Sequence, residues 1–96
     1  MDCIFHPLAV RDARQIEAGY AEISQDLADR FWEELNQELD ELIQYPERQY
    51  FDPSGFRRRN LRRFPVHVLF EIRADLVRVV VIRHHQRDPN YGMRRK

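Results

Sequence analysis

Arginine is the side chain with which this sequence could do most of its chemistry. Residues 57–63 read Arg-Arg-Arg-Asn-Leu-Arg-Arg, and a second basic group runs from Arg83 to Lys96. The planar guanidinium matches phosphate and carboxylate groups with paired hydrogen bonds. A solvated strand face would need fewer charges, so we expect a surface that binds a target or an antagonist through anionic groups. Its expected members are Arg57, Arg58, Arg59, Arg62, Arg63, Arg83, His85 and Arg87.

The charge of the chain is divided between its two halves, although the total is zero. Residues 1–50 carry four basic and twelve acidic side chains, a net charge of −8. Residues 51–96 carry twelve basic and four acidic side chains, a net charge of +8. Such a division predicts one face of a small protein that meets an anionic partner.

Other reactive side chains are too scattered to indicate a cofactor or a metal site. His6, His84 and His85 lack a fourth ligand at zinc-like spacing, and Cys3 is the only cysteine. The glycines are isolated, so they form no phosphate-binding loop. The sequence starts with neither a basic segment nor a long apolar run, and no stretch approaches the roughly 20 apolar residues of a membrane span. We therefore expect a cytoplasmic protein without cofactor, metal or membrane segment.

The elements that position these side chains follow from apolar spacing and from proline. A strand over residues 2–6 precedes Pro7, which fits the first turn of a helix. Apolar residues then recur every three or four positions, which predicts a helical hairpin over 7–23 and 25–45, with Ser24 or Asp26 as the second N-cap. Within it we expect Phe31, Leu35 and Leu39 to be buried, and Trp32 to lie in the core or in a partner groove.

The second half of the chain has a residue pattern typical of β-strands. Valine-rich and isoleucine-rich runs predict a three-strand antiparallel region over 56–85, followed by a basic tail over 86–96. The fold class is then α+β with the order β-α-α-β-β-β, and the helical hairpin packs on a mainly antiparallel sheet in a single domain. Alternation along a strand would place Arg57 and Arg59 on one face and Arg58 on the other. Because both faces cannot bury arginine, we expect an edge strand, a bulge or a loop there.

Four short segments carry a resemblance to a known family. They are Phe5-His6-Pro7 followed by Ala9, residues 27–31 (Leu-Ala-Asp-Arg-Phe), residues 61–65 (Leu-Arg-Arg-Phe-Pro) and residues 84–89 (His-His-Gln-Arg-Asp-Pro). In this order and spacing the chain resembles the RelE/ParE superfamily of type II toxin-antitoxin toxins, and most closely its ParE (plasmid stabilisation) branch. The resemblance implies a toxin that a co-expressed antitoxin neutralises. ParE-like members poison DNA gyrase, whereas RelE-like members cut messenger RNA in the ribosomal A site.

The resemblance leaves three functions open. A gyrase inhibitor acts by binding and needs no catalytic group, whereas a ribosome-dependent endoribonuclease would use Arg63, His67, Arg87 and Tyr91 for charge stabilisation and proton transfer. The third function is that of an inactive toxin relic that only binds antitoxin. Asn60 and His67 occupy positions that are basic in RNA-cleaving relatives, which favours ParE-like action. The expected partners are a cognate antitoxin with DNA gyrase, or with the ribosome and mRNA, in a homodimer or a toxin–antitoxin heterotetramer.

Overall fold

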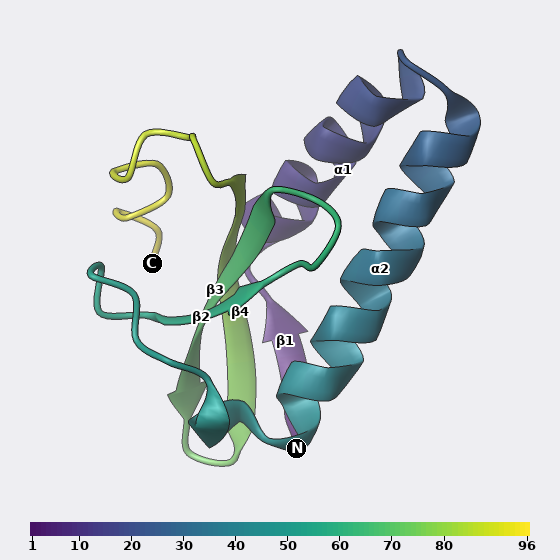
Figure 1. Ribbon diagram of the computed structural model, residues 1–96. Coiled ribbons are helices and arrows are strands. Elements are labelled where there is room, and N and C mark those ends of the chain that lie inside the picture. The colour runs from purple at the N-terminus through teal and green to yellow at the C-terminus, as the bar shows by residue number, and fades with distance from the viewer.

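The computed structural model describes residues 1–96 and consists of a helical hairpin packed on one face of a sheet (Figure 1). Helices α1 and α2 lie side by side, and the C-terminal segment crosses the other face of the sheet. In chain order the elements are β1 (Asp2–Phe5), α1 (Pro7–Ala21), α2 (Gln25–Gln44), a short 3-10 turn (Pro46–Arg48), β2 (Arg57–Asn60), β3 (Val66–Arg73) and β4 (Leu76–His84). The predicted α+β fold class and element order are confirmed.

The sheet has four strands in the order β1-β4-β3-β2. Strand β1 pairs in parallel with β4, whereas β2, β3 and β4 are antiparallel. The β3–β4 register shifts at Leu69 and Phe70, which leaves Val80 as an extra residue, a β-bulge. Strand β2 is an edge strand and ends at Asn60, so Arg62 and Arg63 lie in the loop that follows, in agreement with the expected edge strand and loop.

Both helices begin at side-chain caps. The His6 ring accepts a hydrogen bond at Nδ1 from the backbone N–H of Leu8 (3.0 Å), and Pro7 occupies the first helical position. Ser24 Oγ accepts from the N–H of Leu27 (3.0 Å), so Ser24 is the second cap. Each cap satisfies a backbone donor that has no partner inside the helix.

The main core lies between the helical hairpin and the sheet. Phe31, Leu35 and Leu39 are buried there against valines of β3 and β4, as the apolar spacing predicts. Phe31 also packs edge-on against Phe64, with ring centroids 5.5 Å apart. Trp32 is 37% exposed, so it lies at the surface and outside this core.

Replacing Leu35 with alanine tests the packing of the hairpin on the sheet. We expect Leu35→Ala to lower the free energy of unfolding by about 2–4 kcal/mol, because the side chain is buried and its removal leaves a cavity. Chemical denaturation measures the loss, and Asn36→Ala on the exposed side of α2 is the matched control. A loss below about 1 kcal/mol would place Leu35 outside the core.

Candidate functional site

Strand β2 separates its three arginines onto the two faces of the sheet. On the helix side, Arg59 forms ion pairs with Glu38 (3.0 Å) and with Glu41 of α2. Arg62, in the loop that follows, approaches the same two carboxylates. Part of the positive charge of the second half is therefore neutralised by acidic residues of the first half. We had expected these two arginines to face an external partner. Glu38 is buried, so loss of its partner would leave an uncompensated charge.

Two further arginines of the predicted surface have different surroundings. The Arg57 guanidinium lies 4.3 Å above the ring of Phe51 and donates to the carbonyl oxygens of Glu47 and Gln49, at 3.1 and 3.0 Å. Arg63 is held through its backbone N–H, which donates to the carboxylate of Glu34 (3.1 Å), while its exposed guanidinium forms no ion pair. Arg57 is thus anchored to the connector before β2, whereas the Arg63 guanidinium is free of such contacts.

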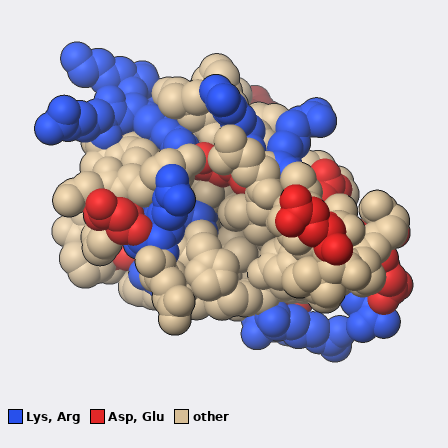
Figure 2. All heavy atoms as spheres, turned by 90° about the horizontal axis from the view of Figure 1, so that it is seen from above, with Lys and Arg blue, Asp and Glu red and all other residues tan.

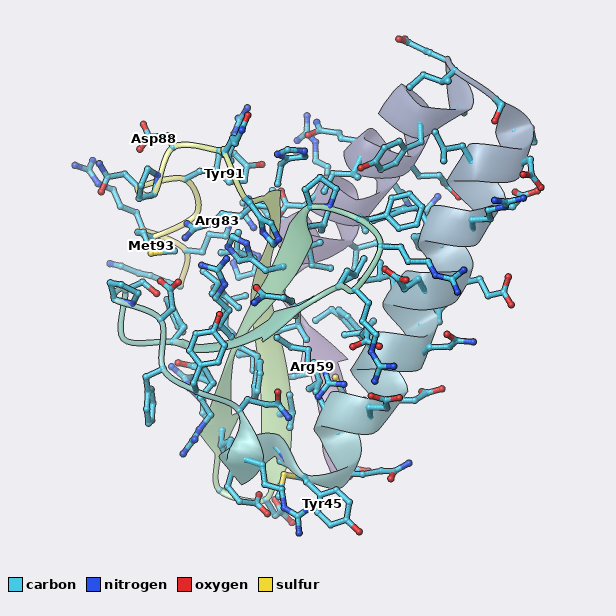
Figure 3. The ribbon with its side chains drawn as sticks, viewed as in Figure 1. Tyr45, Arg59, Arg83, Asp88, Tyr91 and Met93 are labelled. Atoms are coloured by element: carbon cyan, nitrogen blue, oxygen red, sulfur yellow. The ribbon has the colours of Figure 1, made fainter.

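The face of the sheet away from the helices holds a connected polar cluster. Arg83 of β4 donates through Nε to His67 Nε2 (2.9 Å), and His67 Nδ1 lies 2.9 Å from His85 Nδ1. Arg58 donates to Asp52 (3.0 Å) and its other terminal nitrogen lies 3.5 Å from His85 Nδ1. We call Asp52, Arg58, His67, Arg83 and His85 the helix-free cluster; Figure 3 labels Arg83 beneath the C-terminal segment.

Burial, neighbouring charges and hydrogen bonds shift the pKa values of this cluster. Burial and the neighbouring Arg58 and Arg83 lower the pKa of His67 to about 3, so its imidazole is neutral. Burial and Arg58 also lower the pKa of His85. Burial opposes ionisation of Asp52, but hydrogen bonds from Ser54 and Arg58 outweigh it and hold the pKa of Asp52 at about 2. The cluster therefore combines two arginines with one carboxylate and two imidazoles.

The C-terminal segment is held on the sheet rather than hanging free as a basic tail. Asp12 of α1 is 4% exposed and accepts from the Tyr91 hydroxyl (2.6 Å), from both terminal nitrogens of Arg95 (2.6 and 2.9 Å) and from the N–H of Ile82 (3.1 Å). Gly92 adopts φ 83°, and a Cβ there would lie 2.5 Å from Val81 Cγ2, so only glycine fits.

A small second core lies under this segment. Leu69, Val80 and Val81 are buried on the helix-free face, and the bulge in β4 lets Val80 and Val81 join the same cluster. Tyr91 and Met93 pack against them from the C-terminal segment (Figure 3). We call residues 85–96 the strap, because the Asp12 contacts and this apolar patch fasten it to the sheet.

The four residues suggested for RNA cleavage do not converge on one pocket. His67 is buried, and the Tyr91 hydroxyl donates to Asp12, a bond that together with burial raises the pKa of Tyr91. Arg87 is exposed and stacks over the Tyr91 ring at 4.2 Å. Arg63 lies in a separate groove against α2. Only His67 and Arg87 line the groove of 490 Å³ on the helix-free face, together with Asp52, Arg58, Arg83 and His85.

Sequence reasoning missed two carboxylates, that of Asp52 in the helix-free cluster and, with more consequence for the strap, that of Asp12. Its signal was a carboxylate between Ala9, Ala13 and Ile16 on the apolar side of α1, where a charge requires a partner. No three His, Cys, Asp or Glu side chains lie close enough together to hold a metal ion. Neither helix has the length and apolar character needed to cross a membrane.

Comparisons with known proteins agree with this architecture. The sequence model of the family described as "ParE toxin of type II toxin-antitoxin system, parDE" matches residues 3–89. A chain of the solved structure titled "Chromosomal ParDE TA system from P. aeruginosa" superposes with a TM-score of 0.77 at 20% identity, over 88% of this chain and 95% of that chain. At 20% identity, this structural similarity shows a shared fold and nothing more. Comparison with curated protein sequences gives no match.

The buried neutral His67 predicts a loss of stability in acid. The folded-state pKa of about 3 lies below the unfolded value of about 6.5, so the unfolded chain takes up the proton first as the pH falls. Between pH 6.5 and pH 5 we expect this residue to cost about 2 kcal/mol of unfolding free energy. His67→Gln keeps an acceptor for Arg83 and a donor for His85, so urea titrations should show a flatter pH dependence. An equally steep loss in that variant would contradict the assignment.

The Asp12 contacts predict that one substitution releases the strap. Asp12→Ala leaves the Arg95 guanidinium, whose side chain is 9% exposed, without its carboxylate, and should cost about 3–5 kcal/mol. Hydrogen exchange should rise across residues 86–96, and the exposed Asp40→Ala should leave that exchange unchanged. Removing Arg95 in the same chain should recover part of the loss, because no buried charge then remains. Unchanged protection of the strap in Asp12→Ala would show that other contacts hold it.

Proposed function

The chain belongs to the ParE toxin family of type II toxin-antitoxin systems, and we propose that it is a cytoplasmic toxin that inhibits DNA gyrase by binding. A cognate antitoxin neutralises it in this proposal. Membership of the family supplies the class of protein, and the arrangement of side chains on the helix-free face supports action by binding rather than by bond cleavage.

The observation that most supports binding is the state of the two candidate proton-transfer groups. A general base must reach the proton that it abstracts and must be poised near the working pH. His67 is 1% exposed, its two nitrogens contact Arg83 and His85, and its pKa of about 3 makes it a weak base. The Tyr91 hydroxyl is likewise engaged with Asp12. Neither group offers a free acid or base to a phosphodiester at neutral pH.

A binding inhibitor needs a rigid surface, and the arginines supply one. Arg58 has three hydrogen-bond partners, Asp52, Asn60 and His85, so its guanidinium is held in one position. Arg87 stacks on Tyr91, which is itself fixed by Asp12. Side chains that are ordered before binding lose less conformational entropy when a partner arrives. We propose that Arg58 and Arg87, with Arg63 in the loop after β2, contact the target.

The antitoxin in this proposal carries an acidic, amphipathic segment. Ile4, Phe5 and Leu8 expose apolar surface at the β1 edge and the start of α1, and the unpaired arginines supply positive charge. Charges at the rim of an interface mainly set the association rate. Raising the salt concentration should therefore slow formation of the toxin–antitoxin complex more than it speeds dissociation, which stopped-flow fluorescence can measure.

Expression without antitoxin separates the candidate targets. Double-strand breaks and a DNA damage response are expected on induction, whereas codon-phased mRNA cuts would support the endoribonuclease. A well-tolerated chain that still binds its antitoxin would support the inactive relic. Following both readouts in one culture makes the outcomes distinguishable.

Removing exposed arginines should reduce toxicity and spare the fold. The double variant Arg63→Ala, Arg87→Ala is the clean test, because neither guanidinium forms an ion pair, and its thermal midpoint should match the parent within about 2 °C. Adding Arg58→Ala should weaken toxicity further but also destabilise the chain, since Asp52 loses its partner. Arg14→Ala, on the exposed side of α1, is the charge-matched control. Full toxicity of a normally folded triple variant would refute this surface.

A further inference from the structure

We propose that the groove on the helix-free face is an oxyanion site that binds a phosphodiester group of a nucleic-acid backbone. The donors are the guanidinium groups of Arg58 and Arg87 and the imidazole N–H of His85. The inference goes beyond the proposed function, because it concerns binding of nucleic acid by this chain alone. It therefore stands or falls independently of whether gyrase is the target.

The first step is that buried Arg83 sets the direction of a hydrogen-bond chain. An arginine side chain can only donate, so His67 Nε2, 2.9 Å from Arg83 Nε, must be the acceptor. The neutral His67 ring then carries its hydrogen on Nδ1. This hydrogen is donated to His85 Nδ1, 2.9 Å away. Arg58, another obligate donor, also approaches His85 Nδ1 at 3.5 Å, which agrees with an acceptor at that atom.

The second step is that this chain ends in a donor at the surface. Because His85 Nδ1 accepts, the neutral ring carries its hydrogen on Nε2, at the opposite edge of an exposed side chain. No protein group accepts a hydrogen bond from that nitrogen. Arg87, which lines the same groove, is exposed and has no carboxylate partner. The groove of 490 Å³ therefore offers unpaired donors on its exposed rim.

The third step concerns the charge of the groove. Its lining contains three arginines and one carboxylate, that of Asp52. Asp88, the acidic residue of the strap, lies outside the lining and accepts from the backbone N–H of Asn90. Asp52 accepts from Ser54 (2.9 Å) and Arg58 (3.0 Å), so its oxygens are turned toward the protein. In the view from above, the largest group of Lys and Arg side chains lies on the side where Figure 1 places the strap (Figure 2). Net positive charge with free donors fits an anion.

The fourth step distinguishes a nucleic acid from an acidic peptide. Exposed aromatic rings lie beside β2: Tyr50 is 54% exposed and accepts through its hydroxyl from Asn60, and Phe51 is 63% exposed and packs under the Arg57 guanidinium. The Arg87 guanidinium also lies over an aromatic ring, 4.2 Å from the centroid of Tyr91. Alternating cations and exposed rings are typical of surfaces on which successive bases stack while phosphates are neutralised. A peptide carboxylate would use the donors but not these rings.

The binding test uses labelled oligonucleotides and fluorescence anisotropy. Single-stranded DNA, duplex DNA and RNA of one sequence are titrated with the purified chain, and inorganic phosphate and polyglutamate serve as competitors. We expect Arg87→Gln and His85→Ala each to weaken oligonucleotide binding about 3- to 10-fold, and Arg87→Gln to reduce the slope of log affinity against log salt by about 0.7–0.9. Arg14→Gln removes the same charge from α1 and should leave affinity within 2-fold, roughly the size of a non-specific charge effect.

Arg58→Gln and His85→Ala need a check of folding, because the first removes the Asp52 partner and the second leaves the buried His67 Nδ1–H without an acceptor. Arg87→Gln alters an exposed side chain without an ion pair and keeps the test decisive. The proposal is overturned if no oligonucleotide binds, or if Arg14→Gln weakens binding as much as the groove variants. It is also overturned if polyglutamate competes as well as DNA, which would make the groove a site for acidic protein. Long-range ¹H–¹⁵N NMR gives an independent check: hydrogen on His67 Nδ1 and on His85 Nε2 supports the site, and any other pattern contradicts it.

Discussion

The burial of one arginine on the helix-free face of the sheet organises most of this molecule. The side chain of Arg83 is 5% exposed, and a buried guanidinium is stable only when its donors are satisfied. Arg83 donates to His67 and to the carbonyl oxygens of Pro89 and Tyr91, at 2.9 and 3.1 Å, which draws the strap onto the sheet. Asp12 of α1 also holds the strap, because it accepts hydrogen bonds from Tyr91 and Arg95. Two buried charges of opposite sign thus fasten a segment that would otherwise be a basic tail.

The division of charge along the sequence is resolved in two ways in space. On the helix side, acidic residues of α2 neutralise Arg59 and Arg62, so that charge serves the packing of the edge strand on the helix. On the helix-free side, one carboxylate faces several arginines, and the excess remains positive. A surface that is ordered and unneutralised suits recognition, because its geometry exists before the partner arrives. The proposed target contact and the proposed phosphodiester site both use this side.

Local patterns in the sequence predict the scaffold well and the site only in part. The apolar spacing and the His6-Pro7 and Ser24 signals place the hairpin, since caps and helix faces depend on neighbours a few residues away. Alternation separates Arg58 from Arg57 and Arg59, but it cannot say that α2 would bring carboxylates to only one side. The Asp12–Arg95 pair joins residues 83 positions apart, so no local rule could reveal it. The family resemblance indicates the class of protein, yet it does not show that the Tyr91 hydroxyl is held by Asp12.

The central claim is that the chain acts through a preformed binding surface and not through acid–base catalysis. The most direct measurement is the amount of linear DNA that purified gyrase releases from supercoiled plasmid, after detergent and protease treatment, in the presence of this chain. A binding mechanism predicts that linear DNA accumulates with the parent chain and equally with His67→Gln and Tyr91→Phe, which remove the candidate proton-transfer groups. The claim is contradicted if the parent chain yields no linear DNA, or if these variants fold normally and lose the effect.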